Sequence, residues 1–327
     1  MSDGRDRAGD PAAYEAAGSP APPAGVELHT DEPLARHTYL RLGGPARFYA
    51  EPADDEQLGR LVAWAAVAKL PVRVLGGGSN LLVADEGWPG LVLSLRRCCG
   101  EIVFDGSSVR AGAAVMLPAL ARAAAERDLG GLEFAIGIPG SLGGALQSNA
   151  GIGDGRSIGL LVRAVELWRD GDRATVAAAS LRFGYRETSL RGSGALVSGA
   201  TLALEPRPRA DVKAEMRRLL EARQATQPTA EHNAGSIFRN PRGEAAGRLI
   251  EAAGCKGLAV GGARVSELHA NFIVHDGAAR AADIAELVAE VQRRVFAAAG
   301  VRLVPEIEWW GPGDPPEAFA SPPEPPT

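Results

Sequence analysis

Two glycine-rich segments in the first half of the chain have the composition of loops that bind phosphate. Glycine lets a backbone approach a ligand closely and turn its N–H groups toward an anion. A hydroxyl or amide side chain beside the glycines adds a hydrogen bond. The candidate ligand-binding residues of the first loop are Leu75, Gly76, Gly77, Gly78, Ser79 and Asn80.

The second segment has the same ingredients and a proline that stiffens the turn. One glycine-rich stretch alone is usually no more than a turn. Two such loops, each entered from apolar sequence, favour a pyrophosphate held between them. The candidate residues of the second loop are Gly137, Ile138, Pro139, Gly140, Ser141, Gly143, Gly144, Asn149 and Gly151.

Neither loop matches the common nucleotide-binding motifs. The dinucleotide motif Gly-x-Gly-x-x-Gly needs a glycine where this chain has Leu81, counting from Gly76. A P-loop needs a Lys-Ser or Lys-Thr pair after its glycines, and neither loop has one. A Rossmann domain for NAD is therefore disfavoured.

Three polar residues far apart in the sequence are candidates for chemistry: Arg186, Ser236 and Glu306. Taken singly, each has a simpler explanation. The arginine has the properties of a surface ion-pair residue, the serine those of a helix cap or turn, and the glutamate those of a solvated carboxylate. Taken one at a time, each residue therefore favours the simpler explanation over a catalytic role.

The elements that must position these residues alternate between helix and strand, which predicts an α+β fold. A hairpin is expected around Asp170-Gly171-Asp172. Helices are predicted for Asp54–Lys69, Met116–Asp128, Val212–Ala225, Glu244–Ala253 and Ala281–Ala299. Strands are predicted for Pro71–Leu75, Leu91–Leu95, Ile102–Phe104, Val109–Ala111, Val162–Trp168, Ala174–Ala177, Leu196–Leu204, Phe272–Val274 and Val301–Trp309.

Length and composition exclude several classes of protein. The 327 residues suggest about two domains, and the net charge of −5 argues against a nucleic-acid partner. No apolar run approaches the roughly 18 residues of a membrane helix, and the charged residues near the N-terminus are followed by no apolar stretch, so we expect no secretory signal. Three cysteines and five scattered histidines predict neither a disulfide framework nor a metal site. We therefore expect a cytoplasmic, metal-free monomer that acts on a small molecule, with disordered tails at 1–27 and 312–327.

Both loops, together with the segment Thr38–Ala46, resemble the flavin-binding domain of the UDP-N-acetylenolpyruvoylglucosamine reductases. The resemblance extends over residues 38–311. It implies the FAD-binding fold of vanillyl-alcohol oxidase (the PCMH type), with both loops around the FAD pyrophosphate. The implied FAD-binding domain covers 28–208 in two lobes, 28–95 and 96–208. A smaller α+β substrate-binding domain covers 209–311.

The three polar candidates fall on motifs of this family. Arg186 matches the arginine of Tyr-Arg-x-Ser, although Thr188 replaces the serine. Ser236 matches the serine of Gly-Ser-x-Phe-Lys-Asn-Pro, with Arg239 in place of lysine. Glu306 matches the glutamate of a C-terminal Pro-Glu strand. The short path from Ser236 to Asn271 resembles the form of the family that lacks an extra substrate-clamping loop.

The resemblance implies reduction of UDP-N-acetylglucosamine enolpyruvate to UDP-N-acetylmuramate, with FAD and NADPH, in peptidoglycan precursor synthesis. Reduced flavin would give a hydride to the vinyl carbon. Arg186 would bind the carboxylate through two parallel hydrogen bonds, a protonated Glu306 would donate to the enolate, and Ser236 would protonate the adjacent carbon. The implied substrate-binding residues are Arg223, Arg239 and Asn240.

Two alternatives remain open. Oxidases of the same fold often carry FAD on a histidine or cysteine near the first loop, and residues 75–85 contain neither. That leaves an oxidase with non-covalent FAD. A flavin- or nucleotide-binding module without catalysis is the other alternative, and it would not require Arg186, Ser236 and Glu306 to act on one ligand. The sequence does not distinguish NADPH from NADH.

Overall fold

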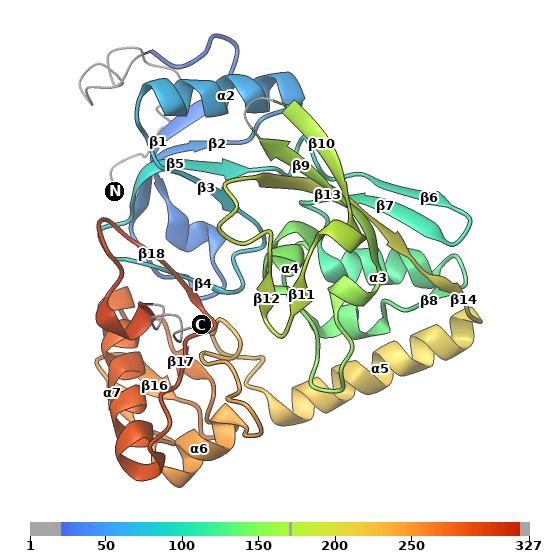
Figure 1. Cartoon of the computed structure of the whole chain (residues 1–327). Coiled ribbons are helices and arrows are strands. Elements are labelled where there is room, and N and C mark those ends of the chain that lie inside the picture. Colours follow the sequence, from blue (N-terminus) through green and yellow to red (C-terminus); the bar gives the residue numbers. More distant parts are fainter. Residues whose placement is uncertain (1–20, 170–171, 321–327) are drawn as a thin grey trace. The chain divides into compact units, whose positions relative to one another are not determined.

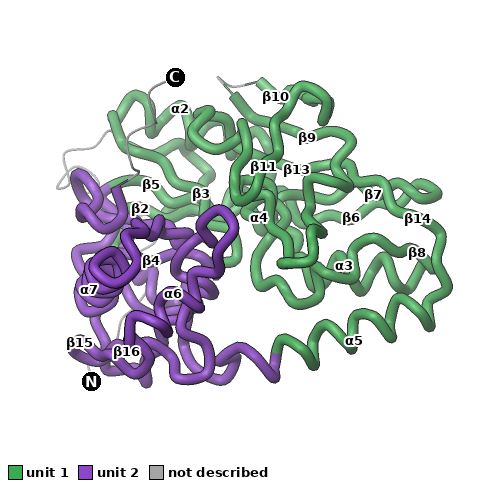
Figure 2. The backbone as a smooth tube through the Cα atoms, turned by 60° about the horizontal axis from the view of Figure 1, so that its bottom comes forward, with its two compact units in different colours: residues 1–32, 47–77, 90–223 green, residues 33–46, 78–89, 224–327 purple. Residues whose placement is uncertain are grey.

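The computed structural model describes residues 21–169 and 172–320, which form two compact units (Figures 1 and 2). The first unit contains residues up to 32, 47–77 and 90–223. The second contains 33–46, 78–89 and the chain from 224 onward. Two short N-terminal stretches join the second unit because Leu40, Leu42 and Leu82 are buried in its core. The units are therefore not continuous in sequence, unlike the two domains that we expected.

The first unit contains two main sheets and four α-helices (Figure 1). Its strands are β1 (Leu28–Pro33), β2 (Pro45–Ala50), β3 (Val72–Leu75), β5 (Trp88–Ser94), β6 (Ile102–Asp105), β7 (Ser108–Gly112), β8 (Leu129–Gly130), β9 (Val162–Arg169), β10 (Asp172–Ala177), β11 (Phe183–Gly184), β12 (Glu187–Thr188), β13 (Leu196–Ala203) and β14 (Glu205–Pro206). Its helices are α2 (Asp55–Val67), α3 (Leu117–Ala125), α4 (Leu142–Ser148) and α5 (Arg209–Thr226), with 3-10 turns at Glu133–Gly137, Ile158–Leu160 and Ala178–Ser180.

The smaller sheet has the order β1-β2-β5-β3 and packs against helix α2. Asp54 caps this helix by accepting a hydrogen bond from the Gln57 N–H at 2.8 Å. The helix buries an apolar face, and Trp64 on that face meets Phe48 of β2 edge-on at 5.2 Å between ring centroids. Strand β3 thus leads from a well-packed sheet into the first glycine loop.

The larger sheet has the order β10-β9-β13-β7-β6, with antiparallel neighbours throughout. The predicted hairpin is confirmed, because β9 pairs with β10 and Leu167 lies opposite Ala174. Its turn residues 170–171 lie outside the described part of the chain. Strand β13 is central and contacts both β9 and β7, so it links the hairpin to the segment that precedes helix α3.

The second unit contains a small antiparallel sheet, β15-β16-β17, a parallel strand pair, β4 and β18, and two α-helices. Helix α7 is amphipathic and buries Ile284, Leu287, Val288 and Val291 in the core. The elements of the second unit are a 3-10 turn (Leu34–His37), β4 (Leu81–Val83), α6 (Ala246–Ala252), β15 (Ala259–Val260), β16 (Ala263–Val265), β17 (Ile273–His275), α7 (Ala281–Ala299), β18 (Glu308–Trp310) and a 3-10 turn (Glu317–Phe319).

Two expectations for the C-terminal region are wrong. The strand predicted for Val301–Trp309 is present only as β18, which pairs in parallel with β4. The preceding residues instead bond to the loop at 237–239. The tail expected from Pro312 is ordered through Ala320, because Gln292 donates to the Ala318 carbonyl at 3.0 Å and Phe319 packs on Trp309. Residues 1–20 and 321–327 of the predicted tails lie outside the described residues.

Within the described residues, no helix is long and apolar enough to cross a membrane.

A buried carboxylate, Asp283, lies at the start of helix α7 and makes the stability of the protein dependent on pH. Asp283 accepts hydrogen bonds from the N–H groups of Arg280 at 2.9 Å and Gly262 at 3.3 Å. These bonds, the one from Arg280 foremost, hold the pKa of Asp283 below its usual value. A lowered pKa in the folded state stabilises the protein above the ordinary carboxyl pKa, and this stabilisation is lost as the pH falls through the lowered value.

We therefore expect Asp283→Asn to lower the free energy of unfolding by about 1 kcal/mol at neutral pH and by less in acid. Urea unfolding at a series of pH values measures this difference. Glu286→Gln is the control, because Glu286 is exposed on the same helix. An equal loss at every pH would show that the Asp283 charge does not contribute.

Candidate active site

The two glycine loops meet within the first unit, as the sequence led us to expect. A Cβ atom on Gly77 would lie 2.8 Å from the Cα of Gly140. A Cβ on Gly76 would lie 2.6 Å from the Ser141 hydroxyl oxygen. Side chains cannot fit at such distances, so the glycines are required for the approach of the two backbones.

The second loop is anchored on both sides by backbone hydrogen bonds. The Gly140 carbonyl accepts from the Leu117 N–H at 2.9 Å, at the start of helix α3. After the loop, Gly143 donates to the Ala113 carbonyl at 2.8 Å. Ser141 caps helix α4 by accepting from the Gly144 N–H at 3.4 Å. The Ser141 hydroxyl oxygen therefore accepts one hydrogen bond within the protein.

The backbone amides of the two glycine loops are placed to donate hydrogen bonds to an anion. Within the described residues, the N–H groups of Gly76, Gly77, Gly140 and Ser141 have no intramolecular acceptor. They lie on two backbones in direct contact. Adjacent unused amides of this kind form concave sites for phosphate oxygens. The residues therefore fit the pyrophosphate of FAD.

The end of the first loop belongs to the second unit. Gly78 has a φ of +66°, and a Cβ there would lie 2.0 Å from the His37 carbonyl oxygen, so only glycine fits. Its own carbonyl accepts from the Tyr39 N–H at 2.9 Å. Asn80 donates from its side chain to the Glu306 carbonyl at 3.0 Å. This predicted flavin-binding residue thus lies beside a predicted catalytic one.

Two of the predicted catalytic residues lie on paired segments of the second unit. The Glu306 N–H donates to the Ile237 carbonyl at 2.7 Å, next to Ser236. The Arg239 N–H donates to the Val304 carbonyl at 2.9 Å. These bonds place the Ser236 and Glu306 backbones side by side, and both residues are partly exposed.

A buried asparagine holds the serine segment in place. Asn271 accepts from the Phe238 N–H at 2.9 Å and donates to the Phe238 carbonyl at 2.8 Å. Its own carbonyl accepts from the Ile237 N–H. Asn271 was not among the predicted site residues, and it lies in the segment His269–Phe272. The structure gives it a positioning role.

Neighbouring polar residues are also used structurally. His269 accepts from the Asn271 N–H at 3.2 Å, and burial lowers the pKa of His269, which favours a neutral ring. Asn240, a predicted substrate ligand, accepts from the Ala246 N–H at 2.9 Å at the start of helix α6. Arg239 beside it is partly exposed.

The third predicted catalytic residue, Arg186, lies in the first unit, on the turn between β11 and β12. Its φ is +55°, an uncommon backbone conformation for an arginine. The guanidinium donates to the Gly151 carbonyl at 3.0 Å. Thr188 donates to the Gln147 carbonyl at 3.3 Å, a bond that the serine of the family motif is also able to make. The threonine is therefore compatible with the same turn.

Asn149 and Gly151, expected at the flavin, make direct contacts to this turn. The Asn149 side chain donates to the Gly184 carbonyl at 2.8 Å and accepts from the Gly159 N–H at 2.9 Å. Gly151 supplies the carbonyl that orients Arg186. The two residues thus connect helix α4, which follows the second glycine loop, to the arginine turn.

Arg223, the remaining predicted substrate ligand, lies near the end of helix α5. Its Cδ atom is 3.6 Å from the place of a Cβ on Gly137, the first residue of the second glycine loop. The predicted substrate ligand and the second glycine loop are therefore neighbours within the first unit.

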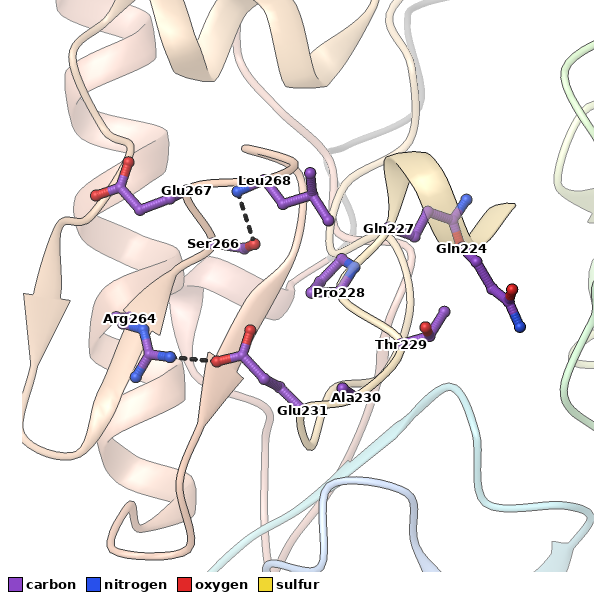
Figure 3. A pocket seen from close by; sticks show the side chains of 10 residues that line it. All are labelled: Gln224, Gln227, Pro228, Thr229, Ala230, Glu231, Arg264, Ser266, Glu267 and Leu268. Atoms are coloured by element: carbon purple, nitrogen blue, oxygen red, sulfur yellow. Dashed lines mark hydrogen bonds and ion pairs between the residues drawn. The ribbon is translucent and has the colours of Figure 1, made fainter. Parts of the chain in front are cut away.

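The second unit also has a pocket of about 390 Å³ that sequence reasoning missed (Figure 3). An ion pair between Arg264 and Glu231 crosses one side, and the Ser266 hydroxyl accepts from the Leu268 N–H at 3.2 Å. None of the predicted site residues lines it. Its lining residues are Gln224, Gln227, Pro228, Thr229, Ala230, Glu231, Arg264, Ser266, Glu267 and Leu268.

Comparison with known proteins gives consistent matches along the chain. Residues 46–169 match the FAD binding domain family, and residues 227–310 match the C-terminal domain of UDP-N-acetylenolpyruvoylglucosamine reductase. The chain is 48% identical over 280 residues to UDP-N-acetylenolpyruvoylglucosamine reductase 2 of Symbiobacterium thermophilum, covering 86% of this chain and 91% of that protein. The reductase of Synechococcus sp. strain WH7803 is 47% identical over 293 residues, covering 87% and 93%.

A solved structure agrees with these relatives. The UDP-N-acetylenolpyruvylglucosamine reductase of Thermus caldophilus matches with a TM-score of 0.74 and 39% identity, over 88% of this chain and 99% of that one. A FAD-binding domain joined to a reductase C-terminal domain defines a flavin-dependent oxidoreductase. The chain belongs to the UDP-N-acetylenolpyruvoylglucosamine reductase family. The predicted fold class and the predicted FAD cofactor are confirmed.

The contact between the loops yields a test of the flavin site. A methyl group on Gly77 must push the second loop away, so we expect Gly77→Ala to raise the dissociation constant for FAD at least about tenfold, or about 1.4 kcal/mol. Flavin fluorescence quenching measures this constant. Gly153→Ala is the matched control, because a Cβ at Gly153 has nothing within 4 Å. Equal FAD affinity in the two variants would contradict the site.

Proposed function

We propose that this chain reduces UDP-N-acetylglucosamine enolpyruvate to UDP-N-acetylmuramate, using NADPH, in peptidoglycan precursor synthesis. Bound FAD supplies the chemistry that passes a hydride from NADPH to the substrate's vinyl carbon. The observation that carries the proposal is the pair of segments holding Ser236 and Glu306, joined by the 2.7 Å bond from the Glu306 N–H to the Ile237 carbonyl. It supports a shared site for the two side chains.

The roles of the three residues follow from their chemistry. Arg186 binds the substrate carboxylate with its charged, planar guanidinium. The Gly151 carbonyl restrains its orientation. Protonated Glu306 donates a hydrogen bond to the enolate oxygen that forms as the vinyl carbon is reduced. Ser236 then delivers a proton to the carbon next to the carboxylate.

The remaining predicted residues would hold the rest of the substrate. Arg223 and Arg239 carry the positive charge that a UDP diphosphate requires. Asn240, whose side-chain oxygen accepts from the Ala246 N–H at the start of helix α6, is the third residue that we assign to substrate binding. We also infer that the protein is cytoplasmic and that it is a monomer. Light scattering of the purified chain tests the monomer.

Anaerobic NADPH oxidation by the FAD-loaded protein tests the function. We expect one flavin reduction without the enolpyruvyl sugar nucleotide and repeated turnover when it is added. Flavin that reduces once and stays reduced in the presence of this substrate would contradict the proposal. Rapid reoxidation of that flavin by oxygen would indicate an oxidase instead.

The Ser236→Ala variant separates the two half-reactions. We expect NADPH to reduce its flavin at the normal rate and turnover of the enolpyruvyl substrate to fall about 100- to 1000-fold, the usual cost of losing one group that acts in the transition state. Stopped-flow absorbance follows both steps. Ser180→Ala is the control, because Ser180 is exposed in the first unit. Normal turnover by Ser236→Ala would remove Ser236 from the mechanism.

A further inference from the structure

Two adjacent cysteines lie in the turn after strand β5, outside the residues assigned to the reaction. The Sγ atoms of Cys98 and Cys99 are 3.4 Å apart. Cys98 is partly exposed and Cys99 is buried. The third cysteine, Cys255, is buried in the second unit.

The two thiols differ in reactivity. The hydrogen bond between the two thiols lowers the pKa of Cys98, Arg173 adds to this effect, and burial and Asp55 oppose it. The same hydrogen bond and burial raise the pKa of Cys99. Cys98 is therefore the more acidic thiol of the pair. A partly exposed thiolate is the reactive form of cysteine.

We propose that Cys98 and Cys99 are a thiol–disulfide exchange site for low-molecular-weight disulfides of the glutathione type. The Cys98 thiolate attacks one sulfur of the small disulfide, whose S–S bond breaks and releases one small thiolate. Cys99 then loses its proton to solvent and attacks the Cys98 sulfur, which releases the second small thiolate. The cysteine pair is oxidised by two electrons, and the small disulfide is reduced to two thiols.

Formation of a disulfide between Cys98 and Cys99 must distort the backbone that joins them. Their peptide bond is trans, so their Cα atoms are about 3.8 Å apart. Ordinary disulfides join Cα atoms about 4.4–6.8 Å apart. The Cys99 carbonyl has little room to move, because a Cβ on Gly112 would lie 2.2 Å from its oxygen. It also accepts from the Ala114 N–H at 2.9 Å.

The segment 113–115, which is hydrogen-bonded to Cys99, is also hydrogen-bonded to the second glycine loop. The Ala113 carbonyl accepts from Gly143, and the Val115 carbonyl accepts from Leu142, each at 2.8 Å. Displacement of the Cys99 carbonyl therefore shifts the loop that we assign to the FAD pyrophosphate. The exchange site then regulates FAD binding, an effect that rests on the proposed flavin site.

Intact-mass spectrometry of the reduced full-length protein after treatment with oxidised glutathione tests the exchange chemistry. We expect the wild type and the Cys255→Ala control to lose two hydrogens and retain no glutathione. Cys99→Ala, or Cys99→Ser if the alanine variant does not fold, stops at one glutathione adduct. Cys98→Ala remains unmodified. A persistent adduct on the wild type, or wild-type reactivity of Cys98→Ala, would overturn the proposal.

Titration of the reduced and oxidised proteins with FAD tests the link to the flavin loop. We expect the oxidised form to bind FAD at least about tenfold more weakly and dithiothreitol to restore the affinity. Equal affinity of the two forms would overturn the link. Reduced protein that binds no FAD would overturn the flavin site itself, and the mass measurement still decides the cysteine chemistry.

Discussion

The close approach of two backbones at the glycine loops is the constraint on which the flavin site depends. Gly77 faces Gly140 at a distance that no side chain tolerates, and the amides on both sides keep their N–H groups available. The apolar core behind strand β3 and helix α2 fixes one loop, and the ladder from Ala113 to Gly143 fixes the other. Packing far from the ligand thus creates the anion site.

In the second unit, the buried side chain of one asparagine holds the segment that carries Ser236. Asn271 satisfies both backbone groups of Phe238, so the segment carrying Ser236 is held by three hydrogen bonds to one residue. The Glu306 segment then pairs with it. A side chain that delivers a proton must be held within a narrow range of geometry. The arginine turn of the first unit uses Asn149 in the same way.

Local sequence patterns predicted the turns and helices whose conformation depends mainly on neighbouring residues in the chain. Glycine and turn residues marked both loops and the β9–β10 hairpin, and apolar periodicity marked the long helices. The extended segment before Glu306 has the same apolar residues as a strand, but its partners are 237–239, and no local pattern encodes that pairing. Likewise, the contacts of Asn149 and Gly151 to the arginine turn depend on how distant segments pack.

The most direct test of the account is a crystal structure of the protein loaded with FAD. The account predicts pyrophosphate oxygens within about 3 Å of the amide nitrogens of Gly76, Gly77, Gly140 and Ser141. A pyrophosphate bound elsewhere, with these amides facing only water, would contradict it.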